Sequence, residues 1–209
     1  MKLAVICANG KAGKLIVKEA LDRGLDVTAV VRGENRTEAV RTIQKDLFDL
    51  TAGDLKGFDV VIDAFGAWTE DTLPLHSTSL KHLCDILSGT DTRLLVVGGA
   101  GSLYVNPEHT VCVADGPDFP DAFKPLAAAM AKALGELRAR SDVKWTYLSP
   151  AGDFQADGER TGGYILGGEE LTLNDRGESV ISYADYAIAM VDEAVSGGHI
   201  QQRISVVRK

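Results

Sequence analysis

A short loop near the amino end carries residues that could bind a phosphate group. The segment CANGKAG, residues 7–13, follows a short apolar run and precedes a segment with helical periodicity. Backbone N–H groups at a helix start, together with the helix dipole, attract an anion. Gly10 would let the backbone approach a pyrophosphate, and Gly13 would allow close helix–strand packing. Cys7 stands where a dinucleotide-binding turn usually begins with glycine, and a cysteine is tolerable there if its φ is negative.

Two other interpretations of this loop compete with a dinucleotide site. A P-loop needs the pattern G-x-x-x-x-G-K-[ST]. In that register the first glycine would be Ala8 and the hydroxyl residue would be Leu15. Both positions fail, so the loop does not predict nucleotide hydrolysis. The remaining alternative is a tight strand-to-helix turn that binds no ligand.

Two arginines after the second apolar run indicate which dinucleotide would bind. An NAD-preferring site usually places an acidic residue there, about 20 residues beyond the glycine loop. Here that position is Arg32, with Arg36 four residues later. Two guanidinium groups suit a 2′-phosphate through charge-assisted hydrogen bonds, which favours NADP(H) over NAD(H). The alternative is that Arg32 pairs with Glu34 or Asp46 at the surface.

The elements that must position these residues alternate along the chain. Apolar runs predict strands, and segments of helical periodicity follow them. This alternation requires right-handed crossovers and a mostly parallel sheet with helices on both faces. We predict an α/β NAD(P)-binding Rossmann fold, a doubly wound sheet within one domain over residues 1–209. The expected strands are 2–7, 26–32, a short one ending near 45–46, 58–66, 93–99 and 143–150, and the expected helices are 12–23, 34–41, 72–87, 121–140 and 182–195.

The last third of the chain differs from the rest in its amino-acid composition. Residues 152–179 are rich in glycine and charge, with YIL and LTL as candidate hairpin arms. Ser182 and Asp185 form a capping-box pattern at the start of the last helix, which Asp185 and Tyr186 are expected to cap and pack. HIQQRISVV reads as a closing edge strand. The substrate region is expected mainly in residues 100–120 and 150–180.

Composition limits the classes of partner. The 209 residues are 45% hydrophobic and 25% charged, which is typical of soluble globular proteins. The net charge of −8 argues against broad nucleic-acid binding but allows one anionic ligand. No apolar run nears the roughly 20 residues of a membrane span, and no signal peptide is evident, so we expect a cytoplasmic protein. The three cysteines form no CxxC and read as reduced thiols, two of them in the core. The four histidines lack metal-ligand spacing, so we expect no metal.

Several segments, taken in order, resemble a known family. They are CANGKAG, VVRGENR, KDLFD, VVIDAFG, LLVVGGAGSLYV, WTYLSPAGDF, GERTGGY and SYADYAIAMVDE. Together they resemble the atypical short-chain dehydrogenase/reductases, and among these the NmrA-like NAD(P)-binding branch of NADH-flavin reductases, related to biliverdin-IXβ/flavin reductase. The resemblance covers nearly the whole chain. VVGGAGSLYV and the pair GERTGGY and SYADYA are its specific parts.

The resemblance implies a set of cofactor-binding positions at the ends of the predicted strands. They are Asn9, Gly10, Lys11, Ala12 and Gly13 for the pyrophosphate, Arg32 and Arg36 for the 2′-phosphate, Asp46 and Leu47 beside the adenine, Ala64, Phe65 and Gly66 along the ribose, and Gly98, Gly99, Ser102, Ser149, Pro150 and Ala151 around the nicotinamide.

One kind of chemistry is missing from the sequence. Many short-chain dehydrogenases protonate a carbonyl oxygen with a Tyr-x-x-x-Lys pair. None of the five tyrosines here has lysine four residues later, so alcohol–ketone chemistry through that pair is not expected. The residues found instead, after Tyr104, Tyr147, Tyr164, Tyr183 and Tyr186 in turn, are Glu108, Ala151, Gly168, Ala187 and Met190.

Flavin reduction needs less from the protein. Close approach of two rings supplies much of the acceleration, and the redox chemistry belongs to the cofactor and the flavin. Ser102 could bond the nicotinamide amide or the acceptor, and Lys124 could supply a proton; the alternatives are a turn-forming serine and a solvated helix lysine. Aromatic candidates for the acceptor platform, each of which could instead be core or loop anchor, are Trp68, Tyr104, Phe119, Phe123 and Phe154.

The favoured function is hydride transfer from NADPH to a small-molecule electron acceptor, a flavin (FMN or FAD) or a similar planar compound. A second hypothesis is an NmrA-like redox sensor that binds the dinucleotide without turnover, which the missing proton-donating pair keeps open. A third is a reductase or isomerase of an unrelated small metabolite. The oligomeric state stays open.

Overall fold

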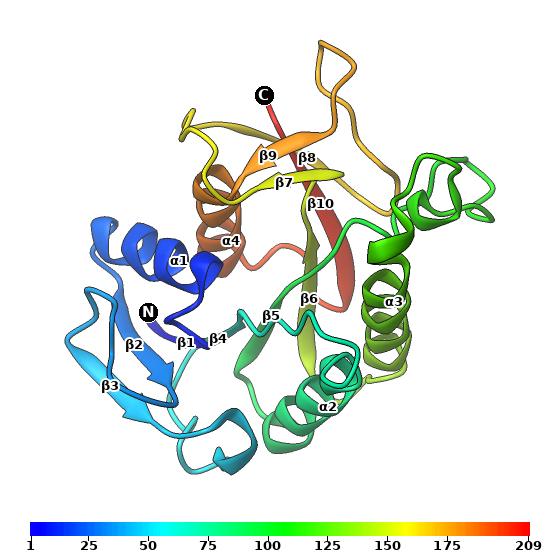
Figure 1. Ribbon diagram of the computed structural model, residues 1–209. Coiled ribbons are helices and arrows are strands. Elements are labelled where there is room, and N and C mark those ends of the chain that lie inside the picture. Colours follow the sequence, from blue (N-terminus) through cyan, green and yellow to red (C-terminus); the bar gives the residue numbers. More distant parts are fainter.

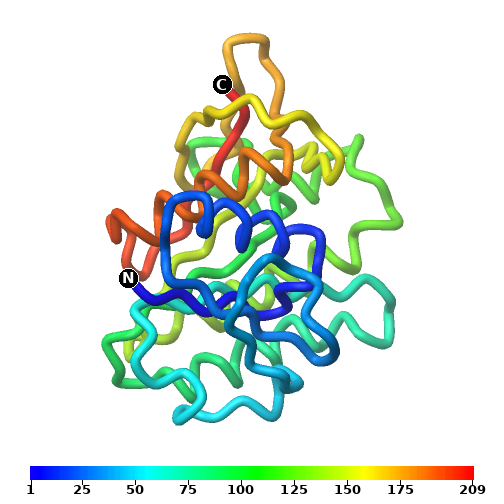
Figure 2. The backbone as a smooth tube through the Cα atoms, turned by 90° about the vertical axis from the view of Figure 1, so that its left-hand side faces the viewer, coloured from blue at the N-terminus to red at the C-terminus, as the bar shows by residue number.

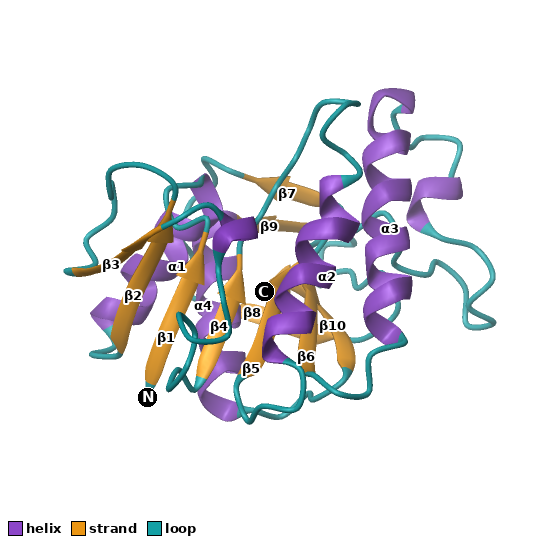
Figure 3. Ribbon diagram, turned by 90° about the horizontal axis from the view of Figure 1, so that it is seen from below, coloured by secondary structure: helices purple, strands orange, loops and turns teal.

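An eight-stranded sheet between two helical layers forms the centre of the structure, a computed structural model that describes residues 1–209 (Figures 1 and 3). Its strand order is β3-β2-β1-β4-β5-β6-β10-β8, and every neighbouring pair is parallel except β10 with β8. The elements are β1 (Lys2–Ile6), α1 (Lys11–Asp22), β2 (Asp26–Val31), β3 (Arg41–Gln44), η1 (Leu47–Asp49), β4 (Val60–Asp63), α2 (Leu75–Leu87), β5 (Arg93–Val97), η2 (Val113–Asp115), η3 (Asp121–Phe123), α3 (Lys124–Arg138), β6 (Lys144–Ser149), β7 (Asp153–Gln155), β8 (Tyr164–Gly167), β9 (Val180–Ser182), α4 (Tyr183–Ser196) and β10 (Gln202–Arg208).

The two faces of the sheet bury separate apolar clusters. Side chains alternate along a strand, so Leu3 and Val5 of β1 face α1 and α4, while Ala4 and Ile6 face α2 and α3. A strand covered on both faces must be apolar throughout, which is why β1 reads as a continuous hydrophobic run. The helices pack in pairs, α1 with α4 and α2 with α3, one pair on each face (Figure 3).

The order in which successive strands are added to the sheet reverses at its middle. From β1 it proceeds through β2 to β3 on one side, and from β4 through β5 to β6 on the other. β1 and β4 are neighbours at this reversal, where an open α/β sheet leaves a crevice at the carboxyl ends of its strands. This arrangement confirms the predicted Rossmann fold. It also brings the loops after β1, β2, β4, β5 and β6 to one edge.

The helix predicted at residues 34–41 is wrong. The segment is a loop that leads into β3. Asn35 organises it: its Oδ1 accepts from the Thr37 backbone N–H at 2.9 Å, and its Nδ2 donates to the Ala39 carbonyl at 2.8 Å. Such local side-chain bonds offer the backbone an alternative to the helix.

The predicted strand pairing after residue 152 is also wrong in two respects. YIL does form a strand, β8, but it pairs antiparallel with β10, and LTL forms no strand, so there is no hairpin between them. β10 lies between β6 and β8 and is therefore an interior strand, with β8 at the edge. A separate parallel pair, β7 with β9, lies above the sheet in Figure 1.

Half of the predicted capping box is present at the start of α4. The Ser182 hydroxyl accepts from the Asp185 backbone N–H at 3.0 Å. The second bond of a capping box, from the Ser182 backbone N–H to the Asp185 carboxylate, is absent. The Asp185 carboxylate is fully buried and accepts from the backbone N–H groups of Thr161 and Gly162 and from the Thr161 hydroxyl, at 2.7–3.1 Å. Asp185 therefore anchors the GERTGG segment rather than capping its own helix, while Tyr186 packs in the core as expected.

Two smaller expectations have different outcomes. Of the three cysteines only Cys84 is buried, because Cys7 and Cys112 lie in loops and are partly exposed; the expectation of two core thiols is wrong. None of the helices combines the length and the apolar character needed to cross a bilayer.

Candidate functional site

The glycine loop forms a tight turn between β1 and α1. The Cys7 carbonyl accepts from the Gly10 N–H at 2.9 Å, and Gly10 is the N-cap of α1, with no side chain bonding its first-turn N–H groups. A Cβ added to Gly13 would lie 2.7 Å from the Cys7 oxygen and 2.9 Å from the Ala8 Cα. Free N–H groups at a close-packed helix start fit a pyrophosphate, so the turn has the chemistry that a dinucleotide requires.

Cys7 does not have the backbone conformation that its residue type predicted. Its φ is +57°, in the left-handed region that favours glycine. The condition under which the sequence made cysteine tolerable here, a negative φ, is therefore not met. Burial, with a smaller contribution from the charge of Asp63, raises the pKa of the Cys7 thiol to about 12. The thiol is neutral at pH 7 and is no nucleophile.

The end of β2 presents two exposed arginines. The Arg32 side chain is 84% exposed, with its Nη1 4.0 Å from Oδ2 of Asp46. The sequence left open a surface pairing of Arg32 with Asp46, and the structure has it. Because Arg32 is so exposed, this ion pair contributes little to the stability of the fold. Arg36 is exposed too, and its backbone N–H donates to the Asn9 side chain. Both guanidinium groups therefore remain available to an anion.

The two residues expected beside an adenine lie at the start of η1. The Asp46 carboxylate caps this short helix by accepting from the Phe48 N–H at 3.0 Å. The Leu47 side chain is 5% exposed and belongs to the core cluster under α2 and α3. Leu47 can therefore border a ligand only through its backbone.

The end of β4 holds a carboxylate that we did not single out in the sequence. Asp63 is 3% exposed, immediately before Ala64, Phe65 and Gly66, and its Oδ1 accepts from the Phe65 N–H at 3.0 Å. Burial raises the pKa of Asp63 to about 6, although the Phe65 N–H opposes the shift. The detectable signal was an aspartate ending the apolar run VVI, since a charged residue is rarely buried without a reason.

Two glycines after β5 pack on a buried phenol. A Cβ on Gly98 would collide with the ring of Tyr147, and the Gly99 N–H donates to the Tyr147 hydroxyl at 3.2 Å. A Cβ on Gly99 would lie 2.9 Å from the Met130 sulfur of α3. Burial raises the pKa of Tyr147 to about 12, so the phenol stays protonated. Sequence reasoning missed this role of Tyr147, because no spacing distinguishes it from other strand residues.

Ser149, Pro150 and Ala151, at and after the end of β6, are buried. The Ser149 hydroxyl has no hydrogen-bond partner within the protein. Such orphaned groups are rare in folded proteins and call for an explanation, of which a ligand is one. Ser149, Pro150 and Ala151 are among the residues that the resemblance places around the nicotinamide, together with Gly98 and Gly99.

The polar candidates for the acceptor side are already engaged. The Ser102 hydroxyl accepts from Arg203 Nη1 at 3.4 Å, and Lys124 Nζ lies 2.6 Å from an Asp121 oxygen at the start of α3. Lys124 is half-exposed, which matches the solvated-lysine alternative. Tyr104 stacks on His109 with ring centroids 4.5 Å apart, and Arg203 lies on the Tyr104 ring at 5.7 Å.

The aromatic candidates do not form one cluster. Trp68 is 69% exposed and Phe123 is 52% exposed, on the segments that precede α2 and α3. These two helices pack side by side on one face of the sheet (Figure 3). Phe119 is half-buried in the long loop before α3. Phe154 belongs to β7, where the rings of Tyr183 and Tyr186 cover it at centroid distances of 3.9 and 4.8 Å.

The comparison with family models identifies the family of the chain. A model described as NAD(P)H-binding matches residues 7–194, from the glycine turn to the end of α4. The chain belongs to this NAD(P)H-binding family. Its ligand is therefore a nicotinamide dinucleotide, and the glycine turn at the β1–β4 switch point is where the fold would hold it.

Members and neighbours of the NAD(P)H-binding family resemble the chain over its full length. The uncharacterized protein YwnB of Bacillus subtilis strain 168 is 44% identical over 210 residues, which is 99% of this chain and 98% of YwnB. The crystal structure of SP1627, a putative NADH-flavin reductase from Streptococcus pneumoniae TIGR4, is 59% identical, with a TM-score of 0.98 and full coverage of both chains. A short-chain dehydrogenase/reductase of Veillonella parvula in complex with NADP is 18% identical, with a TM-score of 0.66 over 99% of this chain and 94% of that one, and shows the fold alone.

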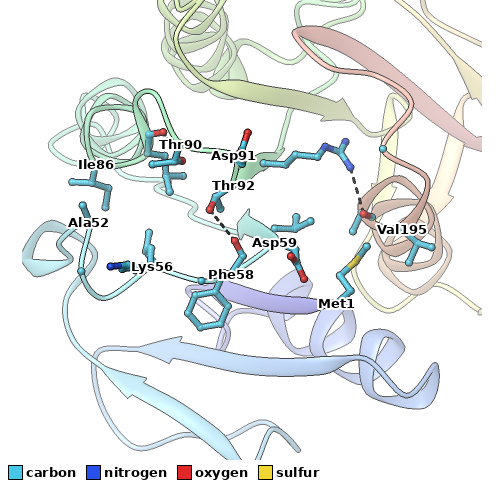
Figure 4. A pocket seen from close by; sticks show the side chains of 18 residues that line it. Met1, Ala52, Lys56, Phe58, Asp59, Ile86, Thr90, Asp91, Thr92 and Val195 are labelled. Atoms are coloured by element: carbon cyan, nitrogen blue, oxygen red, sulfur yellow. Dashed lines mark hydrogen bonds between the residues drawn. The ribbon is translucent and has the colours of Figure 1, made fainter.

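A groove lies at the opposite edge of the sheet, at the amino ends of the parallel strands. This groove of about 780 Å³ is lined by the segments before β4 and β5, by Met1 and by the carboxyl ends of α2 and α4 (Figure 4). Helix carboxyl ends carry partial negative charge, and Arg93 already donates to the carbonyls of Glu193 and Ala194 there. The groove lies at the amino ends of the strands, away from the first turn of α1, so we do not assign it to the NAD(P)H cofactor of the family.

The structure contains no group of three or more His, Cys, Asp or Glu side chains arranged to hold a metal ion.

Proposed function

We propose that this protein is an oxidoreductase that transfers a hydride from NADPH to a flavin or a similar planar acceptor. The family match supports a nicotinamide cofactor, and the full-length likeness to SP1627 supports a redox function. In this proposal the α1 first turn would hold the pyrophosphate, and the loops after β5 and β6 would flank the nicotinamide. Bound NADPH would supply the hydride. The acceptor would lie against the regions 100–120 and 150–180.

The observation that carries the proposal is the surface that α3 presents to the loop after β5. A Cβ on Gly101 would lie 2.8 Å from the Ala127 Cβ, and one on Gly99 would lie 2.9 Å from the Met130 sulfur. Neither alanine nor methionine can donate a proton, and Lys124 pairs with Asp121. Ser102 accepts from Arg203, and a serine hydroxyl is too weak an acid to serve as a proton source by itself. A flavin suits such a site, because its reduced ring can take a proton from solvent after the hydride arrives.

The cofactor preference is a separate part of the proposal. Arg32 and Arg36 are exposed beside the glycine turn, and neither is buried in an ion pair. A 2′-phosphate placed between them would gain charge-assisted hydrogen bonds that NAD(H) cannot make. We therefore expect NADPH to be the reductant.

The test is to mix the protein with NADPH and riboflavin, FMN or FAD and to follow absorbance at 340 nm. Oxidation of NADPH that depends on protein and flavin supports the proposal. The Gly13→Ala variant is the matched control, because its Cβ would close the pyrophosphate turn and should abolish the reaction. Tight binding of NADPH with no oxidation by any of the three flavins would overturn it, and would point to a dinucleotide sensor instead.

A further inference from the structure

The side chain of Asn9 joins two loops that lie far apart in the sequence. Its Oδ1 accepts from the Arg36 backbone N–H at 2.8 Å, and its Nδ2 donates to the Glu34 carbonyl at 2.8 Å. One carboxamide therefore uses its oxygen and its nitrogen on the backbone of the loop after β2. No other hydrogen bond links residues 33–40 to residues 7–13.

The loop that Asn9 contacts is anchored at its far end, where Ala39 is buried in the core, and Asn9 holds its first half to the glycine turn. The loop has no helical or strand hydrogen bonds between the end of β2 and the start of β3, and Glu34 and Arg36 are exposed. Asn35 bonds to Ala39 in the same loop and to Thr42 in β3, so it shapes the loop and ties it to β3 without attaching it to the glycine turn. The position of Arg36 relative to that turn thus depends on Asn9.

We propose that Asn9 is a positioning residue that sets the preference for NADP(H) over NAD(H). The inference rests on the proposed cofactor preference. The pyrophosphate and the 2′-phosphate belong to one adenosine unit, so the glycine turn and the arginines must be held at a fixed separation. Asn9 provides this spacing, and its side chain acts on Arg36 rather than on the pyrophosphate. Binding sites held by such supporting hydrogen bonds lose less freedom when the ligand arrives.

A positioning role makes a distinct prediction from a general structural role. If Asn9 only stabilised the fold, its loss would weaken every ligand alike. If it positions Arg36, its loss would weaken only ligands that carry a 2′-phosphate. Fragments of the cofactor isolate this difference, because 2′,5′-ADP and 5′-AMP differ only by that phosphate.

The experiment is isothermal titration of NADP⁺, NAD⁺, 2′,5′-ADP and 5′-AMP into the unsubstituted protein and the Asn9→Ala variant. We expect the affinity for NADP⁺ and 2′,5′-ADP to fall about tenfold, as for one lost charge-assisted contact, and that for NAD⁺ and 5′-AMP to change less than about threefold. Asn106→Ala is the matched control, since that asparagine also holds a loop through backbone N–H groups, at Thr110 and Val111, away from the cofactor positions. It should leave all four affinities unchanged.

A double-mutant cycle then tests whether Asn9 acts through Arg36. In an Arg36→Ala background the backbone N–H remains but the guanidinium is gone, so Asn9→Ala should cause no further loss of NADP⁺ affinity. If Asn9→Ala fails to fold, Asn9→Ser is used, whose shorter side chain cannot reach both partners.

Three results would overturn the inference. Equal losses for all four ligands would show a general structural role. Additive losses in the double mutant would show that Asn9 does not act through Arg36. Equal affinities of the unsubstituted protein for NADP⁺ and NAD⁺ would remove the proposed cofactor preference and this inference with it, whatever the flavin assay shows.

Discussion

The Cys7 carbonyl oxygen faces Gly13 so closely that a Cβ on Gly13 would come within 2.7 Å of it. The same oxygen accepts the Gly10 N–H and would lie 3.2 Å from a Cβ on Gly10. One carbonyl group thus explains why both glycines are needed. It also ties the conformation of Cys7 to the first turn of α1, which is where the anion would bind.

Gly13→Ala should therefore weaken cofactor binding more than tenfold and destabilise the fold, because the new methyl group meets backbone atoms that cannot move aside. Isothermal titration with NADP⁺ and thermal unfolding are the measurements. Gly135→Ala is the control, since Gly135 lies in α3 with open space around it. That change should stabilise the protein by about 0.5–1 kcal/mol. Unimpaired binding by Gly13→Ala would contradict the placement of the pyrophosphate.

Cys7→Gly should stabilise the protein by about 1 kcal/mol and keep or tighten cofactor binding. The reason is the φ of +57°, which glycine adopts without the steric cost that a Cβ incurs. Denaturant unfolding measures the gain. Cys7→Ala keeps the Cβ and should show no such gain, so it separates the backbone effect from loss of the thiol. A severe loss of binding in both variants would instead reveal a role for the sulfur.

Arg32→Ala should weaken NADP⁺ binding about tenfold or more and hardly change NAD⁺ binding. Loss of one charge-assisted contact costs about 1.5–3 kcal/mol. Titration calorimetry with both cofactors checks the expectation. Arg41→Ala is the matched control, because Arg41 is an exposed arginine on β3 that pairs with Asp26. Equal weakening of both cofactors by Arg32→Ala would refute the 2′-phosphate assignment.

Asp63→Asn should stabilise the protein at neutral pH but not near pH 4. The pKa of Asp63 is about 6 in the folded protein, above its ordinary value of 3.8, because burial opposes the charge. Between pH 3.8 and about pH 6 the folded state retains a proton on Asp63 that the unfolded chain has lost, so the free energy of unfolding declines as pH rises. Above about pH 6 the total loss of unfolding free energy is on the order of 2–3 kcal/mol. Asparagine avoids it and can still accept the Phe65 N–H.

Denaturant unfolding at pH 4 and pH 7.5 tests this sign. The advantage of Asp63→Asn over the unsubstituted protein should appear only at the higher pH. Asp91→Asn should show the opposite trend, because the hydrogen bond from Lys144 holds the pKa of Asp91 below its usual range. A pH-independent difference for Asp63→Asn would contradict the burial argument.

No single polar side chain near the site should behave as an essential acid. Ser102→Ala, Lys124→Ala and Tyr104→Phe should each retain flavin-dependent NADPH oxidation, with losses below the roughly 10²–10⁴-fold expected for a general acid. Steady-state kinetics measures the losses, and Trp68→Ala serves as a contrast that should raise the flavin KM. One polar variant that binds both ligands yet cannot transfer hydride would identify a proton donor and refute the proximity account.

Periodicity and spacing predict much of this molecule. The apolar runs gave β1, β2, β4, β5 and β6, and the glycine spacing gave the phosphate turn, because both depend on residues close together in the chain. The loop at 34–41 was mistaken for a helix, since the side-chain bonds of Asn35 leave no mark on apolar periodicity. The position of β10 between β6 and β8 depends on pairings with residues 35–60 positions away, which no local pattern encodes.

The candidate site also has parts that the sequence predicts and parts that it does not. Its strand-end loops were predictable because a parallel sheet brings them to one edge. The contact of Tyr147 with Gly99 and the bonds from Asn9 to the loop after β2 were not, because each joins segments 25–48 residues apart. The orphaned hydroxyl of Ser149 is likewise a property of its surroundings and not of its residue type.

The interior position of β10 has a consequence for how the protein folds. β10 follows every other strand in the chain, yet β6 and β8 both pair with it. In Figure 2 it is the red segment that leads to the end marked C. Until β10 is in place, β6 has an open edge and β8 has no partner in the sheet. Unpaired edges of this kind invite pairing with other chains. A folding intermediate that lacks β10 is therefore prone to aggregate, and substitutions that weaken β10 should increase aggregation during refolding.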